Sequence, residues 1–197
     1  FLSANDQAYA TLYAMIVKDA LNSMSYPAYL AGLTYDIETV SQGFKVLLQG
    51  YSEKQLVLLE EVLDKLVSTK IDRKRFVTLK DELNKELANK AFDKPYQQAG
   101  RRLKEELIST VWPVEALLDA LVDITPDDLS NWRLEKLANV SLEALFLGNI
   151  NGAQVSQIIE HYEALFKSGK RRKKEPDIRE IKNPQEIKLA LEHDDAA

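Results

Sequence analysis

The residues of this 197-residue chain best suited to chemistry are its two histidines, because the sequence contains no cysteine. His161 lies in the segment HYEAL, and His193 is followed by Asp194 and Asp195. A zinc-binding peptidase helix carries two histidines and a glutamate as H-E-x-x-H or H-x-x-E-H, since imidazoles one turn apart converge on the metal. Neither string occurs in the sequence. We therefore interpret His161 as an ordinary helix residue, and we assign no metal to the cluster at His193, where no second layer of ligands is expected.

Adjacent carboxylates are a second group with chemical potential, but neighbouring residues of a helix point in different directions. We expect them to lie on solvated helix faces; they are Glu60-Glu61, Glu105-Glu106 and Asp127-Asp128. A serine or threonine nucleophile needs a base within hydrogen-bond reach, and no G-x-S-x-G string supports one. The seven glycines form neither phosphate-binding loop motif. The sequence thus assigns no catalytic, cofactor-binding or metal-binding residue.

The basic cluster Lys170–Lys174 suggests contact with a nucleic acid or an anionic surface. The alternative is a solvated linker whose positive charge suits the carboxyl end of a helix. We favour the linker, because no aromatic residues interleave the cluster and the net charge of the chain is −5. An adaptor that uses this cluster to bind an anionic partner is a weaker alternative. A helix surface is expected to carry Arg101, Arg102 and Lys104.

The composition is that of a globular protein, with 45% apolar and 29% charged residues. No apolar run approaches the roughly 20 residues that a membrane helix needs, and we expect neither a membrane nor a nucleic-acid partner. The chain begins at Phe1, without an initiator methionine or a signal peptide, and we expect it to be part of a longer protein. We predict one domain over residues 1–168 and a charged linker over residues 169–197 that leads toward a following domain.

Alternating apolar residues predict strands at Leu33–Val40 and Phe44–Tyr51, joined by a short turn at Ser41-Gln42-Gly43. A third short apolar run, Val140–Leu147, predicts another strand. Helices account for most of the rest. The expected fold class is therefore α+β, an antiparallel sheet with helices packed on one face. We expect the chain to self-associate, either through an uncovered strand edge of an incomplete sheet or through an apolar face that touches a neighbouring domain in the longer protein.

Helix boundaries are predicted from caps and breakers. The first helix is expected over residues 3–24, with Ser3 and Asp6 at its start and a break at Pro27 and Gly32. A helix through Leu66 is expected to begin with Ser52 and Gln55, and later helices are expected to be opened by Asp72, Pro95, Pro113, Thr125-Pro126 and Asn151. The helix from Pro95 is expected to run through Leu103, Leu107 and Val111, and the last helix is expected to stop at Gly169.

The stretch Tyr26–Gln55 also resembles the non-catalytic half of the pitrilysin and insulin-degrading-enzyme family of zinc metallopeptidases. The order and spacing of short strings over about residues 1–166 carry the resemblance, and these are Ala31-Gly32-Leu33, Tyr35, Gly43, Gly50-Tyr51, Lys54-Gln55, Ile71-Asp72, Arg75-Phe76, Gln97-Gln98-Ala99, Glu143-Ala144-Leu145 and Gly148-Asn149-Ile150.

The resemblance implies a pitrilysin-like repeat domain, here incomplete and helix-rich, of the third-domain type. Such enzymes carry four homologous α+β domains in two halves that close around a peptide, and their zinc motif H-x-x-E-H lies in the first domain. The chain would then be a structural, substrate-chamber domain of a zinc-dependent endopeptidase, with no cofactor of its own. Its partners would be the other domains of the same polypeptide and a peptide substrate.

Two further points stay open at the level of sequence. A domain of a catalytically inactive homologue, acting as a scaffold or as a subunit of a processing complex, would have the same sequence features. A bacterial pitrilysin-type parent would be periplasmic, whereas nothing in the residues themselves fixes a compartment.

Overall fold

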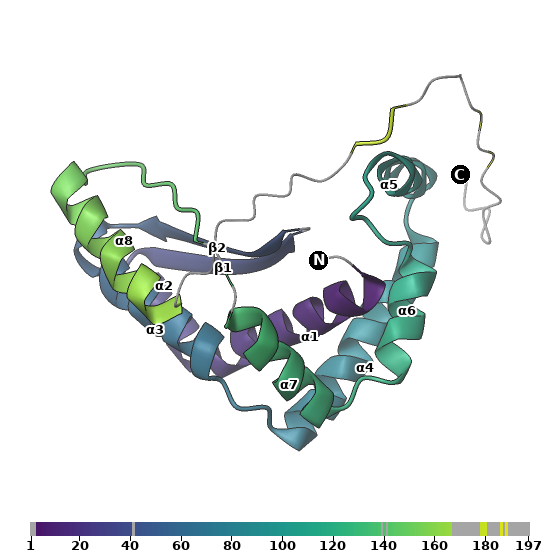
Figure 1. Cartoon of the computed structure of the whole chain (residues 1–197), viewed down its shortest axis with the longest axis horizontal. Coiled ribbons are helices and arrows are strands. Elements are labelled where there is room, and N and C mark those ends of the chain that lie inside the picture. The colour runs from purple at the N-terminus through teal and green to yellow at the C-terminus, as the bar shows by residue number, and fades with distance from the viewer. Residues whose placement is uncertain are drawn as a thin grey trace.

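A two-stranded antiparallel hairpin lies across a layer of helices, and further helices flank it on both sides (Figure 1). The computed structural model describes residues 3–40, 42–138, 140, 142–166, 178–180, 186 and 188. The predicted class is confirmed, since the fold is α+β and rich in helix. None of the described helices is long and apolar enough to cross a membrane.

Strands β1 (Leu33–Val40) and β2 (Gly43–Gly50) form the hairpin, as predicted. Val40 pairs with Gly43, so the connection has two residues, and Gly43 adopts a positive φ of 149° that favours glycine. The alternation that predicts the strands also appears in their burial, because Leu33 and Ile37 are buried while their neighbours Thr34 and Glu38 are exposed. The alternation of the sequence thus fixes which face of the hairpin meets the helices.

The described helical elements follow the sequence signals in most places. They are α1 (Ala4–Ala20), α2 (Asn22–Leu30), α3 (Ser52–Ser68), α4 (Arg73–Asn89), the 3₁₀ turn η1 (Lys90–Phe92), α5 (Pro95–Leu107), α6 (Val114–Val122), α7 (Pro126–Leu137) and α8 (Gly152–Phe166). Predicted caps are confirmed by side-chain oxygens that accept backbone N–H groups at the starts of α1, α4, α7 and α8, namely Ser3, Asp72, Thr125 and Asn151.

Helix α1 is the most enclosed element and lies beneath the hairpin (Figure 1). Its residues Leu12, Tyr13 and Val17 have no exposed surface at all. The helix packs against both strands and against α3, α4, α6 and α7, so it contributes to every side of the core. Full burial of an apolar side chain contributes roughly 1.5–3 kcal/mol, and α1 carries several such side chains.

Polar groups inside this core are paired with the carboxyl ends of helices. The Tyr13 hydroxyl donates to the Leu66 carbonyl in the last turn of α3, at 2.7 Å. Arg133 of α7 donates to the carbonyls of Val67 and Thr69 at the same helix end, at 3.2 and 2.8 Å. The last carbonyls of a helix have no partner within it, so these contacts both satisfy the carbonyls and lock α3 against α1 and α7.

An aromatic cluster joins the hairpin to α1 and α7. The Trp132 ring stacks on Tyr9 with centroids 5.7 Å apart and meets the Phe44 ring edge-on at 6.5 Å. Its indole N–H donates to Asp6 Oδ1 at 2.9 Å, and Lys136 lies 3.1 Å from the same oxygen. The Asp6 side chain therefore makes long-range contacts, in addition to the local helix start that the sequence predicts.

The prediction of one helix over residues 3–24, broken at Pro27, is wrong. The chain turns at Leu21, where α1 ends, and Pro27 lies inside α2. A proline fits the helical φ and removes only one backbone hydrogen bond, which a nine-residue helix packed on β1 tolerates.

The predicted third strand is also wrong. Residues 140 and 142–147 form no strand, and Leu145 and Leu147 are more than four-fifths exposed. Only part of the apolar run, including Leu142 and Phe146, packs against the core. A strand needs a neighbouring strand to hydrogen-bond to, as well as apolar residues. A short apolar run alone therefore does not distinguish a paired strand from an unpaired segment that packs on the core. The described sheet accordingly has two strands, where three were predicted.

Three smaller differences concern helix ends. Tyr51 occupies the cap position of α3 where Ser52 was predicted, and the Gln55 amide donates to the Gly50 carbonyl at 2.9 Å. Helix α5 ends at Leu107, short of the predicted Val111, and Ile108 instead forms a bridge with Ile178. The predicted stop at Gly169 and the predicted boundary between residues 168 and 169 lie outside the described residues, so both stay predictions.

Substitution Tyr13→Phe is expected to destabilise the fold by about 1–2 kcal/mol, because it leaves the buried Leu66 carbonyl without its donor. Urea denaturation followed by circular dichroism measures this loss. The matched control is Tyr96→Phe on α5, whose side chain is 69% exposed and whose hydroxyl is expected to contribute little. Equal midpoints for the two variants would contradict the role of the buried hydroxyl.

Substitution Asp19→Asn is expected to reduce stability at neutral pH and to flatten the acid branch of the stability curve. Hydrogen bonds from Arg75 and its positive charge hold the pKa of Asp19 below its usual range. A lowered folded-state pKa stabilises the fold above the unfolded value of about 3.9 and loses that contribution as the pH falls through the folded value.

The difference in unfolding free energy between the unsubstituted protein and Asp19→Asn should therefore shrink as the pH falls from 7 toward about 3. Asp36→Asn is expected to behave in the same way, because the hydrogen bond and charge of Lys18 lower the pKa of Asp36. A difference that is constant over this pH range would count against both ion pairs.

Candidate functional site

The described histidine does not form part of a cluster. His161 is exposed on α8, with its ring beside that of Tyr162. Among the described residues no group of three or more histidine, aspartate or glutamate side chains could hold a metal ion. His193, Asp194 and Asp195 lie outside the part of the chain that the structure describes, as does the basic cluster Lys170–Lys174.

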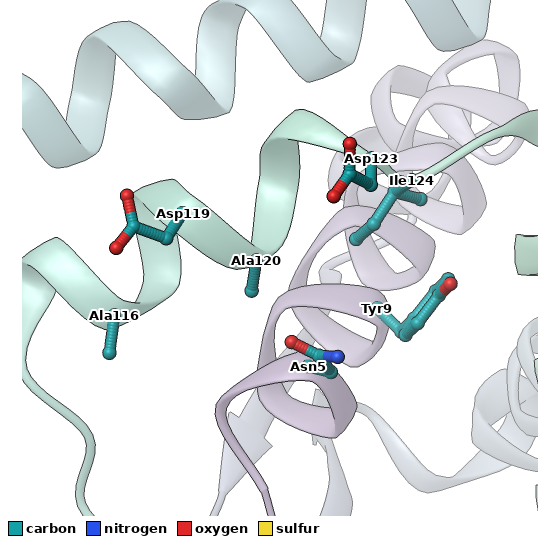
Figure 2. A pocket seen from close by; sticks show the side chains of 7 residues that line it. All are labelled: Asn5, Tyr9, Ala116, Asp119, Ala120, Asp123 and Ile124. Atoms are coloured by element: carbon teal, nitrogen blue, oxygen red, sulfur yellow. The ribbon is translucent and has the colours of Figure 1, made fainter.

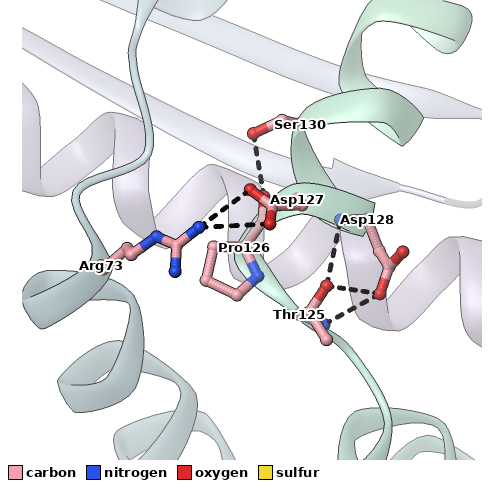
Figure 3. Close-up of polar contacts among 6 residues, drawn as sticks. All are labelled: Arg73, Thr125, Pro126, Asp127, Asp128 and Ser130. Atoms are coloured by element: carbon pink, nitrogen blue, oxygen red, sulfur yellow. Dashed lines mark hydrogen bonds and ion pairs between the residues drawn. The ribbon is translucent and has the colours of Figure 1, made fainter.

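The predicted acidic pairs take three different places. Glu60 and Glu61 are both exposed on α3. Asp127 pairs with Arg73 across the gap to α4 at 3.2 Å. Asp128 instead bonds back to the backbone N–H and hydroxyl of Thr125 at 3.3 and 2.5 Å, so the two carboxylates of this pair serve separate contacts (Figure 3).

The pair Glu105-Glu106 departs from the expectation of two independent, solvated carboxylates. Arg102 Nη1 lies 3.1 Å from Glu105 and Arg102 Nη2 lies 2.8 Å from Glu106, so one guanidinium holds both side chains. The Glu105 side chain is only 9% exposed. Their charge is thus engaged in a local ion-pair network on α5. Arg101 on the same helix is likewise held, by Asp93 at 2.7 Å.

A shallow groove of about 360 Å³ lies between the start of α1 and α6 (Figure 2). Its lining residues are Asn5, Tyr9, Ala116, Asp119, Ala120, Asp123 and Ile124. The carboxylates of Asp119 on α6 and of Asp123 just past its end are exposed. Burial together with the charge of Asp128 raises the pKa of the Tyr9 phenol. The lining holds no histidine, lysine or serine that could form a nucleophile and base pair. The groove has the chemistry of a packing surface with an acidic rim.

An exposed aromatic surface is a stronger candidate for function. We define the α2 surface as Tyr26, Tyr29, Leu30 and Tyr51, each about two-thirds exposed or more. The first three residues share one side of α2 by their helical spacing. The Tyr51 ring lies over Gly32, just past the end of that helix, where a Cβ atom would come within 2.6 Å of it.

Large exposed apolar patches in globular proteins mark contacts with other proteins or domains. The α2 surface is not predicted from the sequence, because a helix break is expected at Pro27. The spacing of Tyr26, Tyr29 and Leu30, at i, i+3 and i+4, is the signal that would have found it.

The open face of the hairpin is a second extended surface. It carries the exposed side chains of Thr34, Glu38, Lys45, Leu47 and Gln49. An ion pair of 2.9 Å between Glu38 and Lys45 spans the two strands. This face alternates charge with apolar area and offers no nucleophile held by a base, so it is suited to contact with a chain of mixed sequence.

Comparison with known proteins shows which protein family the sequence resembles. A sequence model described as the middle or third domain of peptidase M16 matches residues 2–120. The human protein "Insulin-degrading enzyme" is 35% identical over 141 residues, which cover 72% of this chain and 14% of the relative. The Arabidopsis thaliana protein "Insulin-degrading enzyme-like 1, peroxisomal" is 30% identical over 163 residues, which cover 82% of this chain and 17% of the relative.

A solved structure gives the same fold. The crystal structure of pitrilysin superimposes with a TM-score of 0.73 at 18% sequence identity, over 85% of this chain and 18% of that chain. The chain therefore spans less than a fifth of the length of the relatives that it matches.

Substitution Gly32→Ala is expected to destabilise the junction of α2 and β1. Gly32 has φ of +73°, a conformation that costs other residues roughly 1–2 kcal/mol, and the added methyl group also displaces the Tyr51 ring. In a Tyr51→Ala background, Gly32→Ala should reduce the unfolding free energy by less, because the methyl group no longer displaces an aromatic ring. Denaturant unfolding of the four proteins measures this difference, and equal costs in both backgrounds would show that Tyr51 does not cover Gly32.

Proposed function

The chain belongs to the peptidase M16 family, whose middle or third domain it matches, and on this premise we propose that it is a non-catalytic chamber domain of a zinc-dependent endopeptidase. In this proposal the domain forms part of the wall around a peptide substrate and packs against other domains of the same polypeptide. The match of residues 2–120 to the middle-domain model is the observation that carries the proposal.

The described residues do not fit a zinc site. The sequence holds two histidines and no cysteine, and His161 has no acidic or histidine side chains grouped with it as a ligand set. Tetrahedral zinc in a catalytic site takes three protein ligands. We therefore place zinc, and the acid–base chemistry that goes with it, in another domain of the parent protein.

The two exposed surfaces suit different parts of this role. The α2 surface is aromatic and uncharged, as are the centres of protein–protein contacts, and we assign it to packing against a neighbouring domain. The open face of the hairpin mixes charged and apolar side chains, which suits contact with peptides of varied sequence. Relatives named as insulin-degrading enzymes support peptides as the substrate class.

In the full-length polypeptide, the double substitution Tyr26→Ser and Tyr29→Ser should weaken the packing of this domain on its neighbour. Loss of two aromatic anchors from a contact costs on the order of 2 kcal/mol or more. We expect faster limited proteolysis between the domains and lower peptide turnover, with zinc content unchanged. Proteolysis, turnover and metal analysis on the same preparation separate these effects.

The matched control is Tyr96→Ser on α5, which changes an equally exposed tyrosine outside the α2 surface. It should leave proteolysis and turnover as they are. Stoichiometric zinc or peptide turnover in this 197-residue chain alone would overturn the proposal of a non-catalytic domain. Absence of an H-x-x-E-H motif from the full polypeptide would favour the alternative of an inactive scaffold homologue instead.

A further inference from the structure

We propose that the outward side of α5 docks against an apolar surface of the domain that follows this chain in the longer polypeptide. The contact is centred on Gly100, Leu103 and Leu107, which we call the α5 stripe. It is separate from the α2 surface, which is assigned to a neighbouring domain above. The inference rests on the part of the proposed function in which the chain packs against other domains, and not on zinc or peptide hydrolysis.

The polar side of α5 is the side that faces the rest of this chain. Gln98 donates to two carbonyls of the connection at 90–93, at 3.0 and 2.7 Å, and Arg101 donates to a third at 2.7 Å. Glu105 follows on the same side by its helical spacing, and its side chain is only 9% exposed. Polar residues at three successive positions therefore line the inner side of the helix.

The apolar residues of α5 lie on the opposite side, since each residue advances the helix by about 100°. Leu103 is 56% exposed, Gly100 is exposed, and Leu107 is half-buried. No residue of α5 is fully buried. A helix that belongs to a single globular domain turns its apolar stripe to the core. Helix α5 reverses this order, which indicates that its apolar side meets a protein surface that the described part of this chain does not supply.

Gly100 is a second observation that points outward. Glycine is one of the least favourable residues in the interior of a helix. Its backbone is not in the positive-φ region that would require glycine. An added Cβ would also meet no atom of the described chain within 4 Å, so packing within this chain does not require glycine either. A glycine in the middle of an apolar stripe lets another backbone approach closely.

The path of the chain after α8 indicates which domain covers the α5 stripe. Ile178 forms an antiparallel bridge with Ile108, just past α5, and the Arg179 N–H donates to the Leu107 carbonyl at 2.8 Å (Figure 1). A middle domain has polypeptide on both of its sides, so the part that follows is tethered at this end of α5. Tyr96, about 16 Å from Leu107 along the helix, lies outside the proposed contact.

Thiol labelling of the full-length polypeptide tests the contact. Leu103→Cys places a thiol at the centre of the α5 stripe, and mass spectrometry of the labelled peptide reads this position separately from any cysteine of other domains. In the native polypeptide the thiol should react at least about tenfold more slowly than in urea, because docking covers it. Equal rates in the two conditions would overturn the proposal.

A second substitution tests the close approach at Gly100. Gly100→Leu, combined with Leu103→Cys, should restore fast labelling, because the leucine side chain occupies the space that the partner needs. The matched control is Gly152→Leu at the start of α8, where a side chain also meets no described atom within 4 Å. It should leave labelling slow. Circular dichroism shows whether each variant folds, and folded Gly100→Leu protein that still labels slowly would overturn the proposal.

A photoactivatable cross-linker attached to the thiol of Leu103→Cys identifies the occupant. Cross-links to sequence beyond residue 197 of the same polypeptide support the proposal. Cross-links to the preceding domain, to this chain itself or to a second molecule would each overturn it. Labelling does not depend on zinc or on turnover, so an inactive scaffold homologue with the same domains would give the same result. Failure of the peptidase proposal and failure of this contact are therefore distinguishable.

Discussion

Burial of α1 is the constraint on which the rest of the structure depends. A helix that meets strands and helices on all sides has little room for polar groups, and the Tyr13 hydroxyl is a polar group at its centre. Its acceptor is a carbonyl in the last turn of α3, which would otherwise lack a donor. One hydrogen bond therefore satisfies both the buried hydroxyl and the carbonyl at the helix end, and it fixes the position of α3 relative to α1. The hairpin, which follows α1 and α2 in sequence and precedes α3, must fit the space that this arrangement leaves.

The same solution recurs at other helix ends. Arg133 supplies donors to the end of α3, and Lys80 of α4 supplies them to the carbonyls of Val122 and Ile124 at the end of α6. In each case a cation far away in the sequence meets the negative end of a helix dipole. These contacts explain why a chain with many charged residues can assemble several short helices around one core, since part of the charge ties elements together.

Local signals in the sequence were sufficient for the parts of the fold that form locally. The hairpin and the caps at Ser3, Asp72, Thr125 and Asn151 depend on residues within a few positions of one another, and their predictions are confirmed. The predictions at Pro27 and over Val140–Leu147 are wrong, because the local structure of both segments depends on what packs beside them. The engagement of Glu105 and Glu106 by a shared arginine, and the exposure of the α2 surface, also depend on three-dimensional neighbours. A spacing rule that considers one helix at a time therefore predicts neither the ion pairs of these glutamates nor the exposed surface.

The contact between Trp132 and Asp6 has a consequence for the order in which the protein folds. The two residues are 126 positions apart. At synthesis rates of about 5–20 residues per second, roughly 6 to 25 s separate the emergence of α1 from that of the indole that completes its surroundings. During that time the apolar residues of α1 have only part of their final cover. The newly made chain thus passes through a stage in which its most buried helix is only partly covered. The helix α2 and the hairpin, which follow α1 directly in sequence and contact it, are the first elements able to cover it.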